Sequence, residues 1–215
     1  MTKNIFQILI TYVVFILISS KVYADTTTIN GSTTLKDTAF ESLSINGSLN
    51  FRKLEIKKDL NVNGSVDGTK LKCRKLNVNG SLRGEKVKVE YAKVKGSLFV
   101  KDFHVKHDLE VEGGVQAIDI AVAGKTRIDG DLSATDGEFS AIEVMNTKTY
   151  LNKCKVKDIV VKKIAHSNKI QKLDLIEGTI VSGDVIFESG EGEIYLSNDS
   201  IIKGTVKGAQ IIKDK

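Results

Sequence analysis

Apolar and polar residues alternate along most of this chain, and the alternation breaks at regular places. From Leu71 to Gly84 the positions predicted to point inward are 71, 73, 76, 78, 82 and 84. Alternation over a short run is typical of a β-strand, because successive side chains of a strand point to opposite faces. The two polar residues between Cys73 and Leu76 break it and indicate a bend. The pattern therefore predicts short strands that share one apolar face and are joined by bends.

Seven glycines recur every 16 or 17 residues, at Gly31, Gly47, Gly64, Gly80, Gly96, Gly113 and Gly130. Most lie in similar phrases, such as Ile-Asn-Gly-Ser-Leu at 45–49 and Val-Asn-Gly-Ser-Leu at 78–82. Glycine adopts positive φ without steric cost, so each phrase predicts a second sharp change of direction. A fixed period of this kind is typical of a solenoid, in which each repeat buries its apolar face against its neighbours.

When the repeats are aligned, their apolar residues fall into five columns that keep their register. Two columns are Leu54, Leu71, Val87, Phe103, Ile120 and Ile56, Cys73, Val89, Val105, Val122. The others are Leu60, Leu76, Ala92, Leu109, then Val62, Val78, Val94, Val111, Ile128, and Leu49, Val66, Leu82, Leu98, Val115, Leu132. A helical repeat would show a period of 3.6 and fewer β-branched residues. The chain is therefore predicted to be all-β, a single-stranded parallel β-helix of about eleven coils with three strands and three bends per coil.

At about 4.8 Å per coil, this β-helix would be a rod roughly 50 Å long. After about residue 145 the alternation continues without the regular glycine. The segments 166–169 and 188–193 do not follow the pattern, and we expect them to bulge from the coil. The chain has no proline and no linker-like stretch, so it is expected to form a single domain.

The first residues differ from the repeats. Lys3 is followed by an apolar run over 5–19 and by the small-residue phrase Val22-Tyr-Ala24. This order predicts a signal peptide at 1–24 and a β-helix domain at 25–215. The run is short for a membrane span, which needs about 20 residues, and a retained N-terminal anchor is the alternative. We therefore expect an exported protein, periplasmic, cell-surface or extracellular, that meets a membrane only if this segment is kept.

Charge is unevenly distributed along the expected mature chain. Its net charge of +3, from 30 basic and 27 acidic residues, is too small to favour nucleic acid as a partner. In a solenoid, sequence order is also axial order, and the net charges alternate along the axis: −2 over 25–49, +8 over 50–108, −6 over 109–144, +6 over 145–176, −6 over 177–202 and +3 over 203–215. Either these bands are a solvated surface without a partner, or they fix the register of rods that associate.

No group of residues forms a convincing catalytic or metal site. His104 and His107 have metal-ligand spacing, but no third ligand is evident, and a solvated surface pair is favoured. Four carboxylates on adjacent coils resemble the acidic face of a polysaccharide-cleaving β-helix, but only Arg127 lies near them and tryptophan is absent; they are Glu110, Glu112, Asp129 and Asp131. We therefore expect no enzymatic activity, no cofactor and no bound metal.

Two further features have structural interpretations. Cys73 and Cys154 lie about five coils apart, roughly 24 Å, whereas a disulfide needs Cα atoms within about 7 Å. Both are predicted to be free, buried thiols. The Asn-Gly-Ser triplets that begin at 30, 46, 63 and 79 match the N-glycosylation signal, but their recurrence in register favours a turn.

The repeats are similar to those of the bactofilin family, as in Leu60-Asn-Val-Asn-Gly-Ser-Val-Asp-Gly68 and Ile128-Asp-Gly-Asp-Leu-Ser-Ala134. The resemblance covers most of 28–135 and, more weakly, 173–212. It implies a right-handed β-helix of triangular cross-section that polymerises end to end. Two features depart from the family, which is usually cytosolic and has flexible tails, whereas this chain is predicted to carry an export signal and to have only short flanks.

These observations predict a secreted, non-enzymatic structural protein that associates with itself. The open ends of a β-helix leave backbone groups unpaired and core residues uncovered. Ile29 at one end and Ile211 and Ile212 at the other are the expected contact residues. The alternative is an exported binding module or adhesin that presents a long face to a polysaccharide or host surface.

Overall fold

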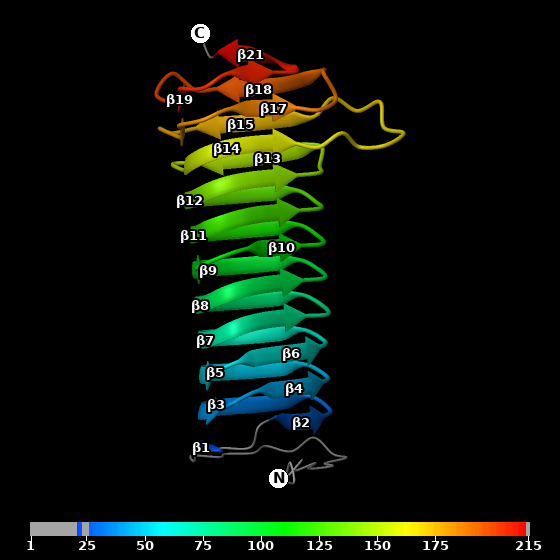
Figure 1. The fold of residues 1–215 in the computed structure, drawn as a ribbon, viewed down its shortest axis with the longest axis vertical. Helices are drawn as coiled ribbons and strands as arrows, with labels where there is room; N and C mark the ends of the chain where they lie inside the picture. The colour runs from blue at the N-terminus through cyan, green and yellow to red at the C-terminus, as the bar shows by residue number, and fades with distance from the viewer. Residues whose placement is uncertain (1–20, 23–25, 214–215) are drawn as a thin grey trace, which may run out of the picture.

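The structure is a computed structural model that describes residues 21–22 and 26–213. All regular structure in these residues is β-strand, and the strands run parallel and wind into a rod (Figure 1). The strands are β1 (Lys21–Val22), β2 (Thr27–Asn30), β3 (Thr33–Phe40), β4 (Leu43–Asn46), β5 (Leu49–Ile56), β6 (Asp59–Asn63), β7 (Val66–Val78), β8 (Leu82–Val94), β9 (Leu98–Val105), β10 (Leu109–Val111), β11 (Val115–Ile128), β12 (Leu132–Val144), β13 (Lys148–Asn152), β14 (Lys155–Val161), β15 (Lys172–Ile176), β16 (Ile180–Val181), β17 (Val185–Phe187), β18 (Gly192–Leu196), β19 (Ile201–Ile202), β20 (Val206–Lys207) and β21 (Ala209–Lys213).

Each strand between the two ends of the rod pairs with the strands one coil before and one coil after it, so the molecule is a β-solenoid of about 11 turns. The register confirms the predicted columns. Leu71 of β7 lies beside Val87 of β8, which lies beside Phe103 of β9, and Ile120 of β11 follows. The predicted fold class is therefore confirmed, and sequence order is axial order over the described coils.

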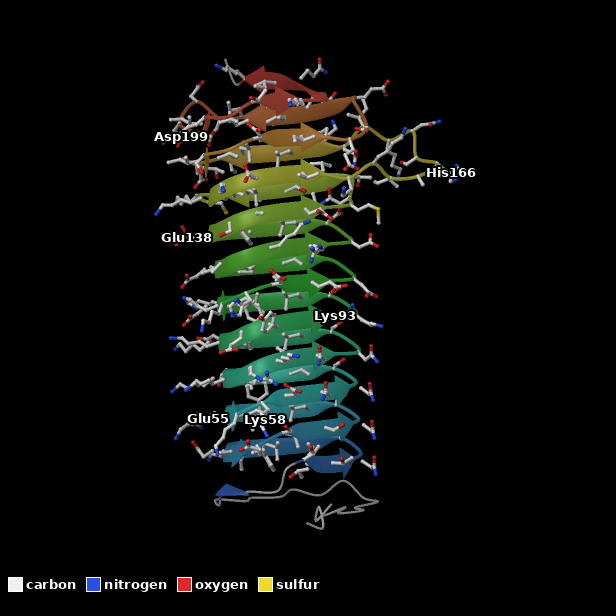
Figure 2. The ribbon with its side chains drawn as sticks, viewed as in Figure 1. Glu55, Lys58, Lys93, Glu138, His166 and Asp199 are labelled. Atoms are coloured by element: carbon white, nitrogen blue, oxygen red, sulfur yellow. The ribbon has the colours of Figure 1, made fainter. Side chains whose placement is uncertain are left out.

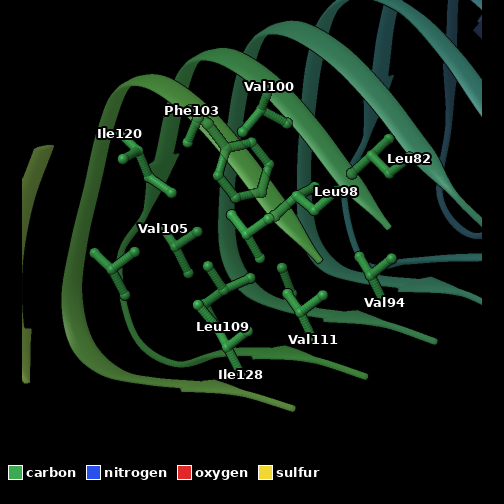
Figure 3. Close-up of a cluster of buried hydrophobic side chains, with 14 of the residues drawn as sticks. Leu82, Val94, Leu98, Val100, Phe103, Val105, Leu109, Val111, Ile120 and Ile128 are labelled. Atoms are coloured by element: carbon green, nitrogen blue, oxygen red, sulfur yellow. The ribbon is translucent and has the colours of Figure 1, made fainter. Parts of the chain in front are cut away.

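The core is a narrow apolar column along the rod axis. Inward side chains from successive coils stack on one another, and Figure 3 shows part of this stack around Phe103. Phe103, Leu98 and Leu109 are fully buried. Full burial of a side chain of this kind is worth about 1.5–3 kcal/mol, and each coil contributes several. The stability of the rod therefore comes from contacts between neighbouring coils.

One corner of the coil explains why the repeat is sometimes 16 and sometimes 17 residues long. Cys73 is in register with Val89 and Val105, and Leu76 is in register with Ala92 and Leu109. In the coils of β7 and β8, two residues separate the Cys73 column from the Leu76 column. In the next coil, three residues separate Val105 from Leu109. The extra residue is taken up in the bend, so the core columns keep their register.

A second corner is formed by charged residues in the left-handed region. In each of eight coils, one non-glycine residue with φ between 49° and 63° lies at this corner. These residues are Asp37, Lys53, Lys70, Lys86, Asp102, Asp119, Asp136 and Lys153. Left-handed backbone costs an ordinary residue about 1–2 kcal/mol. The stacking of the coils holds these residues in that conformation. The sequence analysis did not identify this column: four of its members are aspartates, which adopt this conformation more readily than most residues, but the other four are lysines, which do not favour it.

The glycines form the third corner, where successive coils approach each other very closely. Gly64 has φ of 154°, and a Cβ built on it would lie 2.3 Å from the carbonyl oxygen of Gly47. The predicted positive φ is found at six of the seven glycines. Gly96 is the exception, yet a Cβ there would lie 2.5 Å from the carbonyl oxygen of Gly80. Close backbone approach is therefore the second reason for glycine, which the sequence analysis did not identify.

The coil is less regular after β13. A long loop leaves the rod between β14 and β15, as Figure 1 shows, and it contains the expected bulge at 166–169. Of the other expected bulge, at 188–193, only residues 188–191 form a short turn, with Gly190 at φ of 81°, whereas Gly192 and Glu193 belong to β18. Both segments leave the core columns in register on either side, because Leu175 pairs with Leu151 and with Leu196.

Candidate functional site

The C-terminal end of the rod exposes an inward column. Ile211 of β21 continues the column of Leu173 and Ile194, since Leu173 pairs with Ile194 and Ile194 with Ile211. Ile194 is fully buried, whereas Ile211 is 43% exposed. Within the described residues, no strand pairs with the outer edges of β19, β20 and β21. This end therefore presents both apolar surface and unpaired backbone groups.

Ile212 occupies a different position from its neighbour. It pairs with Tyr195, an outward residue that is 40% exposed, so Ile212 lies on the side of the rod. The sequence analysis grouped Ile211 and Ile212, but the register places Ile211 alone in a core column. Ile202, Val206 and Ala209 are the partly buried residues of this last coil that pack against the core.

The N-terminal end is built differently. Ile29 begins an inward column through Ile45 and packs, partly buried, against the core. Lys21 and Val22 form β1, which pairs with Ala39 and Phe40 of β3 and so occupies part of the edge of the first coil.

Most of the predicted signal peptide at 1–24 lies outside the described residues, which include only 21 and 22 of it. Cleavage after Ala24 would remove β1 and leave this edge of β3 without a partner. Nowhere in 21–22 or 26–213 is there a helix long and apolar enough to cross a membrane.

The four asparagines of the Asn-Gly-Ser triplets form a hydrogen-bonded ladder. The side-chain amide of Asn46 donates to Asn30 at 2.8 Å, that of Asn63 to Asn46 at 2.9 Å, and that of Asn79 to Asn63 at 3.1 Å. The column continues as Lys95, which ends the ladder. The triplets lie at the bends beside the stacked glycines, as the turn interpretation predicts. The ladder itself needs the coil register and was not predicted.

The polar residues considered for chemistry are engaged locally. Nδ1 of His104 lies 3.2 Å from Asp102, and the ring of His107 stacks on Tyr91 with centroids 4.7 Å apart. The described part of the chain contains no group of three or more side chains that could hold a metal ion. His166 lies at the tip of the loop that leaves the rod (Figure 2).

The acidic cluster is partly neutralised by a lysine that the sequence analysis did not consider. Nζ of Lys93, labelled in Figure 2, lies 2.7 Å from Glu110 and 3.5 Å from Glu112. Hydrogen bonding to Glu110 raises the pKa of Lys93, so this lysine stays charged at neutral pH. Asp129 and Asp131 are exposed on the next coil. The four carboxylates are therefore divided between a charge-paired group and a solvated one.

Both cysteines are free and buried, as predicted. Burial raises the pKa of Cys73 to about 12 and that of Cys154 to about 11. Cys73 lies in the predicted column, whereas Cys154 lies in the neighbouring one, next to Gly137. At neutral pH neither thiol forms an appreciable amount of thiolate.

We expect the native protein to resist thiol reagents from pH 7 to pH 9. An exposed thiol, with a pKa of about 8.5, would become strongly reactive over this range, whereas these two pKa values lie above it. In denaturant without reductant, both thiols should react with Ellman's reagent. Fast native labelling would contradict the burial of the two thiols, and the absence of any reactive thiol after denaturation would indicate a disulfide and contradict the register that places them in separate coils.

Ion pairs between neighbouring coils are common on the outer surface. Nζ of Lys155 lies 3.1 Å from Glu138, and Arg74 lies 3.1 Å from Asp59. These side chains are well exposed, and pairs of this kind contribute little to stability. The axial bands keep their net charges, although many of their charged side chains form local pairs.

Comparison of the chain with protein-family models, with curated proteins and with solved structures gives no match. The fold is a β-solenoid in which, among residues 21–22 and 26–213, no strand covers the last coil.

Proposed function

We propose that this protein is an exported, non-enzymatic structural protein that assembles end to end, in the manner of the bactofilin family that its repeats resemble. The observation that supports this most directly concerns the C-terminal coil. Its core column ends in the exposed Ile211, and its outer strand edges are unpaired within the described residues. An uncovered strand edge is a template for pairing with another chain.

The opposite end of a second copy has the chemistry to fill this surface. The N-terminal coil of one copy would stack on the C-terminal coil of another. Its parallel strands and Ile29 would continue the coils and the core of that copy. The end bands have opposite net charges, −2 over 25–49 and +3 over 203–215. This difference favours contact between unlike ends. A contact between unlike ends does not close on itself and therefore produces filaments.

Removal of β1 is part of the proposal. While β1 pairs with β3, it blocks part of the edge that a second copy would use. Cleavage after Ala24 would free this edge only after export, so assembly would be confined to the exported form.

Electron microscopy and sedimentation velocity of the chain from Asp25 onward test the proposal. We expect unbranched rods whose lengths are multiples of roughly 50 Å, and sedimentation coefficients that rise with concentration. A single monomeric species at high concentration would contradict end-to-end assembly.

A further inference from the structure

A row of outward side chains runs along one face of the rod and includes both aromatic and uncharged polar residues. The register places Phe99, Gln116, Ser133 and Tyr150 side by side on successive coils. Three strand spacings separate the first from the last, or about 14 Å. The two rings therefore lie at the ends of a short stretch whose middle carries an amide and a hydroxyl.

The surface is hollowed between the two rings. A trough of about 520 Å³ is lined by Phe99, Gln116, Ser133 and Tyr150, with Ser97, Gly114, Asp131 and Lys148 along one side. Its volume lies within the range of sites that bind small molecules. We call this surface the Phe99–Tyr150 trough.

A change in the repeat contributes to the hollow. The residue after the column glycine is serine in five successive coils, at 32, 48, 65, 81 and 97, but in the next coil it is Gly114. A Cβ on Gly114 would meet only the carbonyl oxygen of Asp131, at 3.7 Å, which is an ordinary contact. Neither φ nor backbone crowding requires glycine here. The missing side chain therefore opens space in the trough without any benefit to the coil.

Two polar side chains of the trough are unpartnered within the described part of the chain, whereas Nζ of Lys148 at its side lies 3.5 Å from Asp174. Among the described residues, the side chains of Gln116 and Ser133 form no hydrogen bond. The ring of Phe99 is steadied by the Arg83 guanidinium, whose Cζ lies 5.8 Å from the ring centroid. The trough thus offers free donors and acceptors between two aromatic rings.

We propose that the Phe99–Tyr150 trough binds a segment of a neutral polysaccharide. The C–H faces of sugar rings pack on aromatic rings, whose faces are electron-rich, and sugar hydroxyls both donate and accept hydrogen bonds. The charge of the surface favours this occupant. The four residues of the row are uncharged, although 27% of the residues of the chain are charged, and the two charged side chains at one side of the trough, Asp131 and Lys148, have opposite signs. The trough therefore has no net charge that would select an anionic or a cationic polymer.

Affinity gel electrophoresis of the purified protein tests this inference. The gels contain hydroxyethyl cellulose, galactomannan, soluble starch or dextran, with polygalacturonate as the anionic comparison. We expect retardation by at least one neutral polysaccharide. Tyr150→Ala and Gly114→Gln should each weaken it at least about tenfold, because one removes a stacking ring and the other fills the hollow. Tyr195→Ala is the matched control, since Tyr195 is an exposed tyrosine of the same row outside the trough.

Thermal unfolding of each variant verifies that it is folded. Three results would overturn the inference: no retardation in any neutral gel, retardation by polygalacturonate alone, or retardation that survives both Tyr150→Ala and Gly114→Gln. A loss of self-association in Tyr150→Ala would instead assign this face to contacts between copies and also overturn it. The trough lies several coils from both ends, so variants of Ile211 should leave glycan binding unchanged.

Discussion

Replacing Gly64 by alanine is expected to destabilise the solenoid by at least about 3 kcal/mol. The new Cβ would lie 2.3 Å from the carbonyl oxygen of Gly47, in backbone that cannot move away freely. The backbone N–H of Gly47 donates to the backbone carbonyl oxygen of Asn63 at 3.0 Å, and that of Gly64 donates to the carbonyl oxygen of Asn79 at 3.1 Å. Both glycines are therefore held in place by hydrogen bonds to the next coil. The change therefore forces apart two coils that share a continuous core. Urea unfolding followed by circular dichroism measures the loss.

Gly31→Ala is the matched control for this prediction. Gly31 occupies the same phrase in the first coil and has φ of 107°, but a Cβ there would meet no atom within 4 Å. Its substitution carries the conformational cost alone, about 1–2 kcal/mol. The difference between the two variants isolates the cost of separating the coils. Equal effects would show that backbone conformation, and not close approach, accounts for the glycine column.

Replacing Ile211 by lysine is expected to weaken end-to-end assembly at least about tenfold. Burial of an isoleucine side chain is worth about 1.5–3 kcal/mol, and each 1.4 kcal/mol corresponds to a factor of ten in the dissociation constant. A lysine in the inward column would also bring an unpaired charge into the contact between copies. Sedimentation velocity over a concentration series measures the change.

Ile212→Lys provides the comparison, because Ile212 has similar exposure, 38% against 43%, but lies on the side of the rod. Its substitution should leave assembly within about threefold of the unmodified chain. If both variants assemble normally, the C-terminal coil is not the contact surface. If Ile212→Lys alone prevents assembly, the copies associate side by side.

The sequence by itself determined the class of fold and most of the core. Alternation is a local property, and the glycine spacing repeats it often enough to fix the register between coils. For this reason the columns of Leu54 and Leu49 were predicted residue by residue, and the structure confirms them. The separation of Cys73 and Cys154 followed from the same register.

The tertiary structure alone decided which residues form the corners and which surfaces are exposed. Lys53 and Lys70 adopt left-handed backbone only because the stacked coils impose it, against their own preference. Ile211 and Ile212 are neighbours with the same side chain, and only strand pairing separates an end residue from a side residue. Phe99 and Tyr150 are 51 positions apart, and outward residues carry no repeated pattern that would align them. Burial restricts the inward positions to apolar residues and so leaves a pattern in the sequence, whereas solvent accepts many side chains and leaves none.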